Sequence, residues 1–135
     1  MKVLFVSSTP FLMEPLGVLM LIASCRRAGH DARLAILRRH RVGRIAEAFR
    51  PDVVAYSAST GDLDLFTKTD EEVLAAAKSW PKPPFRVMGG PHPTFSPNVL
   101  EEMDLDAVCQ GDGDEALPDL LSRLEAGAAF DDIPN

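Results

Sequence analysis

Five short, nearly continuous apolar runs alternate with five longer segments of helical periodicity, and this alternation limits the fold more than any other feature. The runs cover residues 2–8, 30–38, 52–58, 85–90 and 106–111, and the helical segments cover 15–29, 43–50, 64–80, 97–103 and 114–127. Only the second run alternates apolar with polar residues. Strands that are apolar along their whole length are buried on both faces, and strict strand–helix alternation is typical of a parallel sheet covered by helices.

We therefore predict an α/β fold: a Rossmann-like, flavodoxin-type sheet of five parallel strands in the order 2-1-3-4-5, with helices on both faces. Right-handed crossovers between parallel strands leave few other orders. Within the first helix, helical spacing places Leu16, Leu19, Ile22 and Ala23 on one face. In folds of this kind, ligands bind at the carboxyl ends of the strands, beside the switch between the first and third strands. The functional site is accordingly expected in the loops that follow the strands.

The composition fits one globular domain and excludes some classes of function. The chain has 135 residues, of which 46% are hydrophobic and 25% charged, and its formal net charge is −6. An acidic chain does not suit general nucleic-acid binding, which requires a basic surface to neutralise phosphates. The N-terminal run is too short for a signal peptide or a membrane span. We predict a cytoplasmic protein that binds neither nucleic acid nor membrane.

The chain has two cysteines, Cys25 and Cys109, which are far apart in the sequence. Such a pair forms neither a metal cluster nor a redox CxxC motif. Both lie in apolar runs, so we expect two buried, reduced thiols. No residue is predicted to act as a protein ligand to a metal or as a catalytic group.

Four of the loops that follow the strands carry Gly, Ser or Thr directly at the strand end. They are SSTPFLMEPLG, SASTGD, GGPHPTF and GDGDE. Glycine lets a ligand approach the backbone closely, and small hydroxyl residues offer hydrogen bonds without bulk. In any single loop these residues need no functional explanation, because they are common in loops. Four such loops at one edge of a sheet favour a ligand site.

Known nucleotide motifs fit these loops poorly. No GxGxxG follows the first strand, and no Walker A motif is present. The only GxG, at 111–113, is followed by two carboxylates that would repel a pyrophosphate. A flavodoxin-like mononucleotide site remains open, because the hydroxyl residues at 7–9 could hold a phosphate, although the rest of that loop is apolar.

Almost the whole chain resembles the N-terminal cobalamin (B12)-binding domain of B12-dependent radical SAM enzymes. The matching stretches are EPLGVLMLIASCRRAGHDA, PDVVAYSASTGD, VMGGPHPTFSPNVLEEM and DAVCQGDGDEALPDLL. Among these, GGPHPTF and GDGDE at their mutual spacing are the most specific. The resemblance implies that the corrin ring lies over the carboxyl edge of the strands. It also implies that the nucleotide tail of the cofactor passes down between elements of the first and third strands.

Two of the three motifs of the wider B12-binding fold have counterparts here. That fold carries SxL at the end of the third strand and GG at the end of the fourth. Ser57 takes the serine position, with Ser59 where the leucine would be, and Gly89 and Gly90 match the glycine pair. The resemblance implies that the Ser57 hydroxyl bonds the base of the tail and that the glycines make room for the tail or the ring edge.

The remaining motif, DxHxxG after the first strand, is absent. When Gly17 is aligned with its glycine, Glu14 falls at the histidine position and Leu12 at the aspartate position. Cobalt prefers imidazole nitrogen to a carboxylate in this setting, and the aspartate that would orient such a ligand is missing. The resemblance therefore implies a base-off cofactor, with its benzimidazole displaced into the protein and no first-loop histidine on cobalt.

The predicted cofactor site draws on four of the five strand-end loops. It consists of Ser8, Thr9, Pro10, Leu16, Gly17, Ser57, Ser59, Thr60, Gly89, Gly90, Pro91, His92, Gly111 and Gly113. His92, between two prolines, has three explanations: an axial cobalt ligand, a contact to the corrin or its tail, or a turn residue that packs on the following helix. The fixed φ of the prolines makes the ligand role the weakest of the three.

The cluster motif of radical SAM enzymes, CxxxCxxC, does not occur in these residues. We therefore predict that residues 1–127 form a cobalamin-binding domain that is not catalytic by itself. Residues 128–135 are predicted to begin a linker to a radical SAM domain, which would hold S-adenosylmethionine and the 4Fe-4S cluster. The whole enzyme would most often be a methyltransferase. The alternatives are a stand-alone cobalamin-binding or regulatory module and a flavodoxin-like nucleotide-binding protein.

Overall fold

The predicted sheet is present in a computed structural model, which describes residues 1–8 and 15–135. Five parallel strands form one sheet in the order β2-β1-β3-β4-β5, as the sequence predicts. Their bounds are Lys2–Ser7 for β1, Asp31–Ile36 for β2, Val53–Ser57 for β3, Phe85–Gly89 for β4 and Ala107–Val108 for β5. The last strand is much shorter than the run at 106–111 predicts, because it pairs only with β4, at the edge of the sheet.

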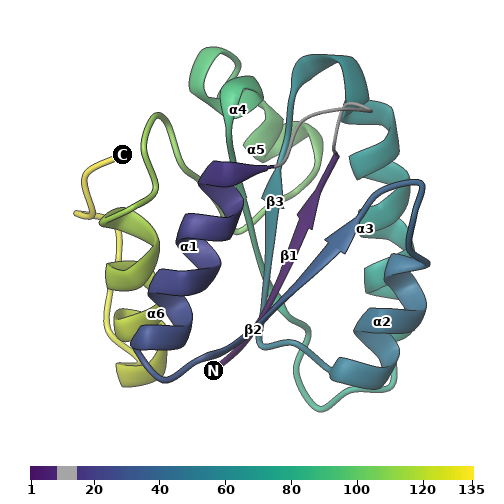
Figure 1. The fold of residues 1–135 in the computed structure, drawn as a ribbon, viewed down its shortest axis with the longest axis horizontal. Helices are drawn as coiled ribbons and strands as arrows, with labels where there is room; N and C mark the ends of the chain where they lie inside the picture. The colour runs from purple at the N-terminus through teal and green to yellow at the C-terminus, as the bar shows by residue number, and fades with distance from the viewer. Residues whose placement is uncertain (9–14) are drawn as a thin grey trace.

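Helices cover both faces of this sheet (Figure 1). They are α1 (Leu16–Arg27), α2 (Val42–Phe49), α3 (Leu63–Ala77), α4 (Pro91–Phe95), α5 (Val99–Glu102) and α6 (Ala116–Ala126), and a 3₁₀ turn at Thr60–Asp62 precedes α3. The predicted loop GGPHPTF contains the short helix α4, because Pro91 at its first position presets a helical φ. In Figure 1, α1 and α6 lie to the left of the sheet, and α2 and α3 lie to the right.

The core divides into two clusters, one on each face of the sheet. On β1, the side chains of Leu4 and Val6 belong to the cluster under α2 and α3, whereas Val3 and Phe5 belong to the cluster under α1 and α6. Successive side chains of a strand point to opposite faces, so both sets are buried only when both faces are covered. This explains why β1 is apolar at every position from 3 to 6.

The buried face of α1 differs from the apolar face that helical spacing defines, and one prediction about burial is wrong. The buried face of α1 carries Val18, Ile22 and Cys25, whereas Leu16 is 64% exposed and Leu19 is 39% exposed. The first half of this helix is apolar all round, so helical spacing alone does not fix which side faces the sheet. Cys25 is buried as predicted, but Cys109 is only partly buried because it follows the short edge strand.

A buried polar network joins β3, α3 and β4. The Tyr56 hydroxyl donates to Asp70 Oδ1 at 2.7 Å, and Arg86 Nη1 donates to Asp70 Oδ2 at 2.8 Å. The second guanidinium nitrogen of Arg86 donates to the carbonyl of Asp104, and its backbone N–H donates to the Asp106 carboxylate. Burial, with the negative charge of Asp70, raises the pKa of Tyr56 well above its usual range. The network therefore fixes β4 to the elements on either side of it.

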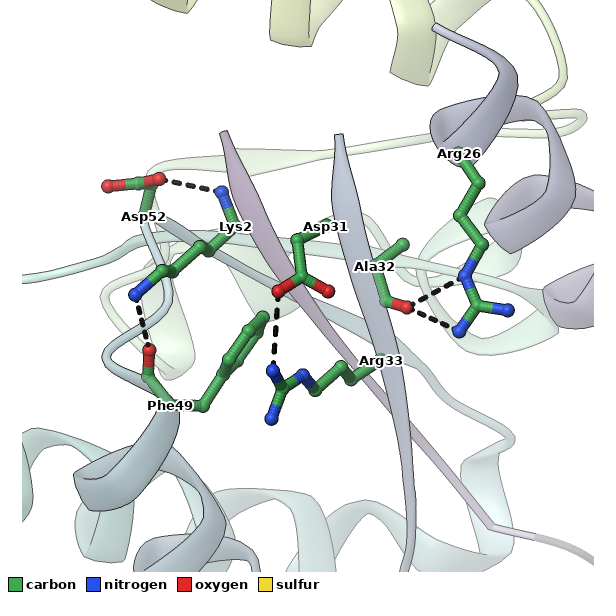
Figure 2. Close-up of polar contacts among 7 residues, drawn as sticks. All are labelled: Lys2, Arg26, Asp31, Ala32, Arg33, Phe49 and Asp52. Carbon is green, nitrogen blue, oxygen red and sulfur yellow. Dashed lines mark hydrogen bonds and ion pairs between the residues drawn. The ribbon is translucent and has the colours of Figure 1, made fainter. Parts of the chain in front are cut away.

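Polar contacts of a different kind secure the amino edge of the sheet (Figure 2). The backbone N–H of Lys2 donates to Asp52 Oδ2 at 2.7 Å, and the Lys2 ammonium donates to the carbonyl of Phe49 at 3.2 Å. The guanidinium of Arg26 donates twice to the carbonyl of Ala32, at 3.1 and 2.7 Å. These contacts tie α1 and α2 to the strands at the end opposite the predicted site.

We expect Asp70→Ala to reduce the free energy of unfolding by about 3–5 kcal/mol, because it leaves the Arg86 guanidinium buried without its carboxylate. Urea-induced unfolding measures this loss. Glu71→Ala, at the exposed neighbouring position of the same helix, is the matched control and should change stability by less than about 0.5 kcal/mol. Equal losses in the two variants would contradict a structural role for the network.

Candidate functional site

Three adjacent strands end level with one another at the carboxyl edge of the sheet. Ser7 of β1 is paired with Ser57 of β3, and Ser57 is paired with Gly89 of β4. The register of parallel strands thus brings residues from three distant parts of the sequence side by side. The loops that follow β3 and β4 begin at this edge, as the sequence predicts.

A cleft of about 400 Å³ lies against these strands on the side covered by α1 and α6. This volume falls in the range of small-molecule and cofactor sites. Most of its lining is apolar, contributed by Phe5, Val18, Leu21, Ala55, Val87, Leu117, Leu120, Phe130 and Ile133 among others. Five of the predicted site residues also line it, namely Ser57, Gly89, Gly90, Gly111 and Gly113. The cleft is therefore an apolar space with small, polar or backbone-exposing residues at the strand ends.

Gly89, which ends β4, and Gly90, which follows it, differ in whether a side chain would fit. Gly90 has φ +99°, and a Cβ atom there would lie 2.9 Å from the Ala58 carbonyl oxygen. The same carbonyl accepts a hydrogen bond from the His92 N–H at 3.0 Å, so the chain crosses closely over the end of β3. A Cβ atom on Gly89 would meet only Cys109 Cβ, at an ordinary 3.6 Å. Backbone geometry requires Gly90, whereas Gly89 leaves room at the cleft wall.

Thr94 connects the two most specific loops of the sequence. Its hydroxyl donates to the Gly90 carbonyl at 2.8 Å and accepts from the Gly111 N–H at 3.0 Å. Gly111 itself has φ +100°, a conformation that favours glycine. The Thr94 side chain thus connects the GGPHPTF loop to the GDGDE loop at the carboxyl edge of the sheet. Sequence reasoning gave Thr94 no role, although it lies inside the motif.

His92 is buried in α4 and is only 6% exposed. Its Nδ1 lies 3.1 Å from Thr60 Oγ1, and no partner among the described residues reaches its Nε2. His92 does not belong to the cleft lining. A buried, unpartnered nitrogen is unusual in a folded protein, so His92 stands out as a polar group beside the site.

Of the predicted site residues that the structure describes, the others lie outside the cleft lining. Ser8 and Ser59 are half-buried, whereas Leu16, Gly17, Thr60 and Pro91 are exposed. Thr9 and Pro10, like Leu12 and Glu14 of the missing motif, fall outside the described residues. The structure thus gathers one group of predicted residues around a cleft and leaves a second group on the surface nearby.

Large apolar side chains are exposed near the same edge. Leu16 and Met20, in the first turns of α1, are 64% and 62% exposed, and Phe95 at the end of α4 is 86% exposed. Figure 1 places the start of α1 and the whole of α4 at the end of the molecule where the strands terminate. The three side chains thus leave apolar surface accessible at the carboxyl end of the sheet.

The apolar walls of the cleft were not found from the sequence, because Leu117 and Leu120 look like ordinary core residues and Phe130 lies in the segment predicted to be a linker. Cys109, also in the lining, is a thiol whose pKa is raised by burial and by the charge of Asp112. A raised pKa keeps this thiol protonated at neutral pH and disfavours metal binding by it. Within residues 1–8 and 15–135, no group of three or more His, Cys, Asp or Glu side chains is placed to hold a metal ion.

None of the helices that the structure describes is long and apolar enough to cross a membrane. The longest, α3, has 15 residues, whereas a spanning helix needs about 20 apolar residues.

The chain is similar in sequence to proteins of known family. Residues 2–121 match the family model described as the B12 binding domain. The chain is 32% identical to a hopanoid C-3 methylase from Methylococcus capsulatus, over 99% of this chain and 28% of that protein. It is 34% identical to an uncharacterized methyltransferase from Pyrococcus horikoshii, over 84% of this chain and 25% of that protein. An anaerobic magnesium-protoporphyrin IX monomethyl ester cyclase from Cereibacter sphaeroides is 30% identical and is covered over 19% of its length.

Solved structures show the same fold. The cobalamin-dependent S-adenosylmethionine radical enzyme OxsB, with aqua-cobalamin and S-adenosylmethionine bound, superposes with a TM-score of 0.80 over 97% of this chain, at 16% identity. This chain covers 20% of that protein. A flavodoxin from Pseudomonas aeruginosa superposes with a TM-score of 0.55, also at 16% identity, over 93% of both chains. At such identities the two likenesses establish the fold and its flavodoxin-type strand order.

We expect Gly90→Ala to lower the free energy of unfolding by more than about 1 kcal/mol, because the new methyl group meets the Ala58 carbonyl and φ is unsuited to alanine. Gly89→Ala is the matched control, since its methyl group has room, and it should cost less than half as much. Thermal unfolding followed by circular dichroism measures both. A Gly89 variant as unstable as the Gly90 variant would contradict this distinction.

Proposed function

Because this chain belongs to the B12-binding domain family, we propose that it holds cobalamin at the carboxyl edge of its sheet, as the cofactor domain of a radical SAM methyltransferase. The observation that carries the proposal is the apolar cleft that meets that edge between Ser57, Gly89 and the 111–113 turn. Its position agrees with the general rule that α/β sheets of this type bind ligands at the carboxyl ends of their strands.

The residues present fit the parts of a cobalamin. The apolar lining suits a flat, apolar base, and the Ser57 hydroxyl offers that base a hydrogen bond. Gly89 keeps the cleft wall free of a side chain at the strand end. The exposed Leu16, Met20 and Phe95 offer apolar contact to a broad ring lying over the edge. When bound, cobalamin supplies a cobalt–carbon bond from which a methyl group is transferred, and this chain's residues bind and orient it.

We further propose that the cofactor is bound base-off and without a histidine on cobalt. The chain has three histidines. His30 lies at the amino edge, with Nδ1 3.1 Å from the amino group of Met1. His40 accepts the Ile36 N–H through its own Nδ1 at 2.8 Å, and His92 is engaged with Thr60. The cleft lining contains no histidine, which supports a lower cobalt face without an imidazole ligand from this chain.

The chain spans about a quarter or less of the curated relatives it matches, at 28%, 25% and 19% of their lengths. Two of those relatives are described as a methylase and a methyltransferase, which supports methyl transfer as the reaction of the whole protein. S-adenosylmethionine and a 4Fe-4S cluster are assigned to a further domain, since Cys25 and Cys109 cannot form CxxxCxxC. A CxxxCxxC motif in the coding sequence beyond Asn135 would support this assignment, and a stop codon there would favour the stand-alone module.

Titration of the purified chain with hydroxocobalamin tests the main proposal. We expect saturable binding, seen as a shift of the corrin absorption bands. Gly89→Ala should bind about tenfold more weakly, because its methyl group takes up space in the cleft. Gly61→Ala is the control, since a Cβ atom there meets nothing within 4 Å and Gly61 does not line the cleft.

Absence of binding by a chain whose circular dichroism shows the native fold would overturn the proposal. Purification of a yellow, flavin-containing protein would instead favour the flavodoxin-like alternative.

The lower-face proposal is tested by electron paramagnetic resonance of the bound cofactor in its Co(II) state. A nitrogen nucleus bound axially splits the cobalt lines, so we expect a spectrum without nitrogen splitting. His92→Ala should leave that spectrum unchanged. Nitrogen splitting in the wild type that disappears in His92→Ala would contradict the proposal and make His92 the ligand.

A further inference from the structure

One edge of the sheet is formed by a full-length strand, β2, whose outward backbone groups have no neighbouring strand. β2 pairs only with β1, whereas the other edge strand, β5, has only two residues. The N–H groups of Asp31 and Leu37 donate to carbonyls of β1. Because the backbone groups of successive residues in a strand face opposite sides, Ala32, Leu34 and Ile36 direct theirs away from the sheet. An edge of this kind is a template for pairing with another chain.

Arg26, near the end of α1, occupies the outward carbonyl at the start of this strand (Figure 2). Its Nε and Nη2 atoms donate to the carbonyl oxygen of Ala32 at 3.1 and 2.7 Å. A carbonyl oxygen has two lone pairs, and one guanidinium therefore takes both acceptor positions of Ala32. A second strand that approached this edge would find no acceptor at this residue.

His40, in the turn after β2, occupies the outward groups at the other end of the strand. Its Nδ1 accepts the Ile36 N–H at 2.8 Å, and its own N–H donates to the Ile36 carbonyl at 2.9 Å. The Arg39 N–H donates to the same carbonyl at 3.2 Å. A ring nitrogen accepts a hydrogen bond only when it carries no proton, so this contact requires Nδ1 of His40 to be unprotonated. Both groups that Ile36 directs outward are thus bonded within the chain.

The occupied groups are those that a second copy of the chain would need in order to extend the sheet. In an antiparallel pair of β2 strands centred on Leu34, Ala32 lies opposite Ile36 of the second copy. The Ile36 N–H would donate to the Ala32 carbonyl across this pair, and two-fold symmetry would repeat the bond. Arg26 occupies the acceptor and His40 occupies the donor of each such bond. Only the central pair of Leu34 residues remains available.

We propose that Arg26 and His40 are blocking residues, which keep the β2 edge from pairing with the same edge of a second copy of this chain. The hydrogen bonds of one central residue pair are too few to offset the freedom that two molecules lose on association. None of the residues of β2 lines the cleft, so the blocking residues prevent association through this edge whichever ligand the cleft holds.

Amide hydrogen exchange, followed residue by residue by NMR, tests the contact made by His40. In the wild type we expect the Ile36 N–H to be at least about tenfold more protected than the Leu34 N–H, which faces away from the sheet. His40→Ala should remove most of the protection of Ile36 and leave Leu34 unchanged. Arg39→Ala, at the neighbouring exposed position of the turn, is the matched control and should change neither amide. If His40→Ala leaves Ile36 protected, His40 is not a blocking residue.

Analytical ultracentrifugation of a variant that combines Arg26→Ala with His40→Ala tests the closed edge itself. A pair of edge strands forms a small and therefore weak interface, so we expect reversible dimers at concentrations on the order of 100 µM, where the wild type stays monomeric. Each single variant should also stay monomeric, because one partner of each cross-strand bond remains occupied. In the dimer, the Leu34 N–H should become at least about tenfold more protected than in the dilute variant.

The matched control combines Arg27→Ala with Arg39→Ala. Both arginines are exposed, on the same helix and the same turn as the blocking residues, and this variant should remain monomeric. A double variant of Arg26 and His40 that is folded by circular dichroism but monomeric would overturn the proposal. Dimers without protection of Leu34 would also overturn it, since they form through another surface.

A wild-type dimer in which Leu34 is protected would overturn the proposal as well, because the edge would then be open to pairing. If the double alanine variant does not fold, Arg26→Met combined with His40→Leu replaces it. These side chains keep bulk at both positions and remove the guanidinium donors and the imidazole acceptor. The exchange of Ile36 in His40→Ala, measured on a single variant, decides the role of His40 independently of either double variant.

Discussion

The ion pair between Arg86 and Asp70, with Tyr56 bonded to the same carboxylate, is the interaction on which the placement of β4 depends. All three residues are at most 8% exposed. Removing charges from water is costly, and here both carboxylate oxygens and both terminal guanidinium nitrogens have a partner. The network holds β4 between β3 and the segment before β5. Since Gly89 ends β4 and Gly90 follows it, the geometry of the cleft rim depends on this network as well.

The two faces of the sheet differ in packing: one is filled by side chains, and the other holds the cleft. Beneath α2 and α3 the cluster is filled by large side chains such as Phe66, Met88 and Tyr56, and the polar network lies on this side. Beneath α1 and α6 lies the cleft. An open cleft lowers the stability of a domain, because the side chains that line it lose packing contacts. Concentrating close packing and the buried ion pair on the opposite face offsets that cost.

Sequence patterns were sufficient to predict the sheet and its strand order, because continuous apolar strands alternating with helices permit few arrangements. They also place Ser57 and Gly89 at strand ends, and both residues line the cleft. They did not predict contacts between residues that are far apart in the sequence. Nothing local marks Asp70 as the partner of Arg86, or Phe130 as a cleft wall rather than a linker residue. They also failed at Leu16, because an all-round apolar helix does not define its own buried face.

The two chain ends lie at opposite edges of the sheet (Figure 1). The amino group of Met1 pairs with Glu125 at 2.8 Å beside His30, whereas Asn135 reaches the turn after β5 at the rim of the cleft. The position of each chain end matters for the design of fusion proteins. A tag or reporter joined to Met1 forgoes one exposed ion pair, worth at most about 1 kcal/mol, and emerges far from the cleft. Any segment joined to Asn135, natural or engineered, begins at the rim of the cleft.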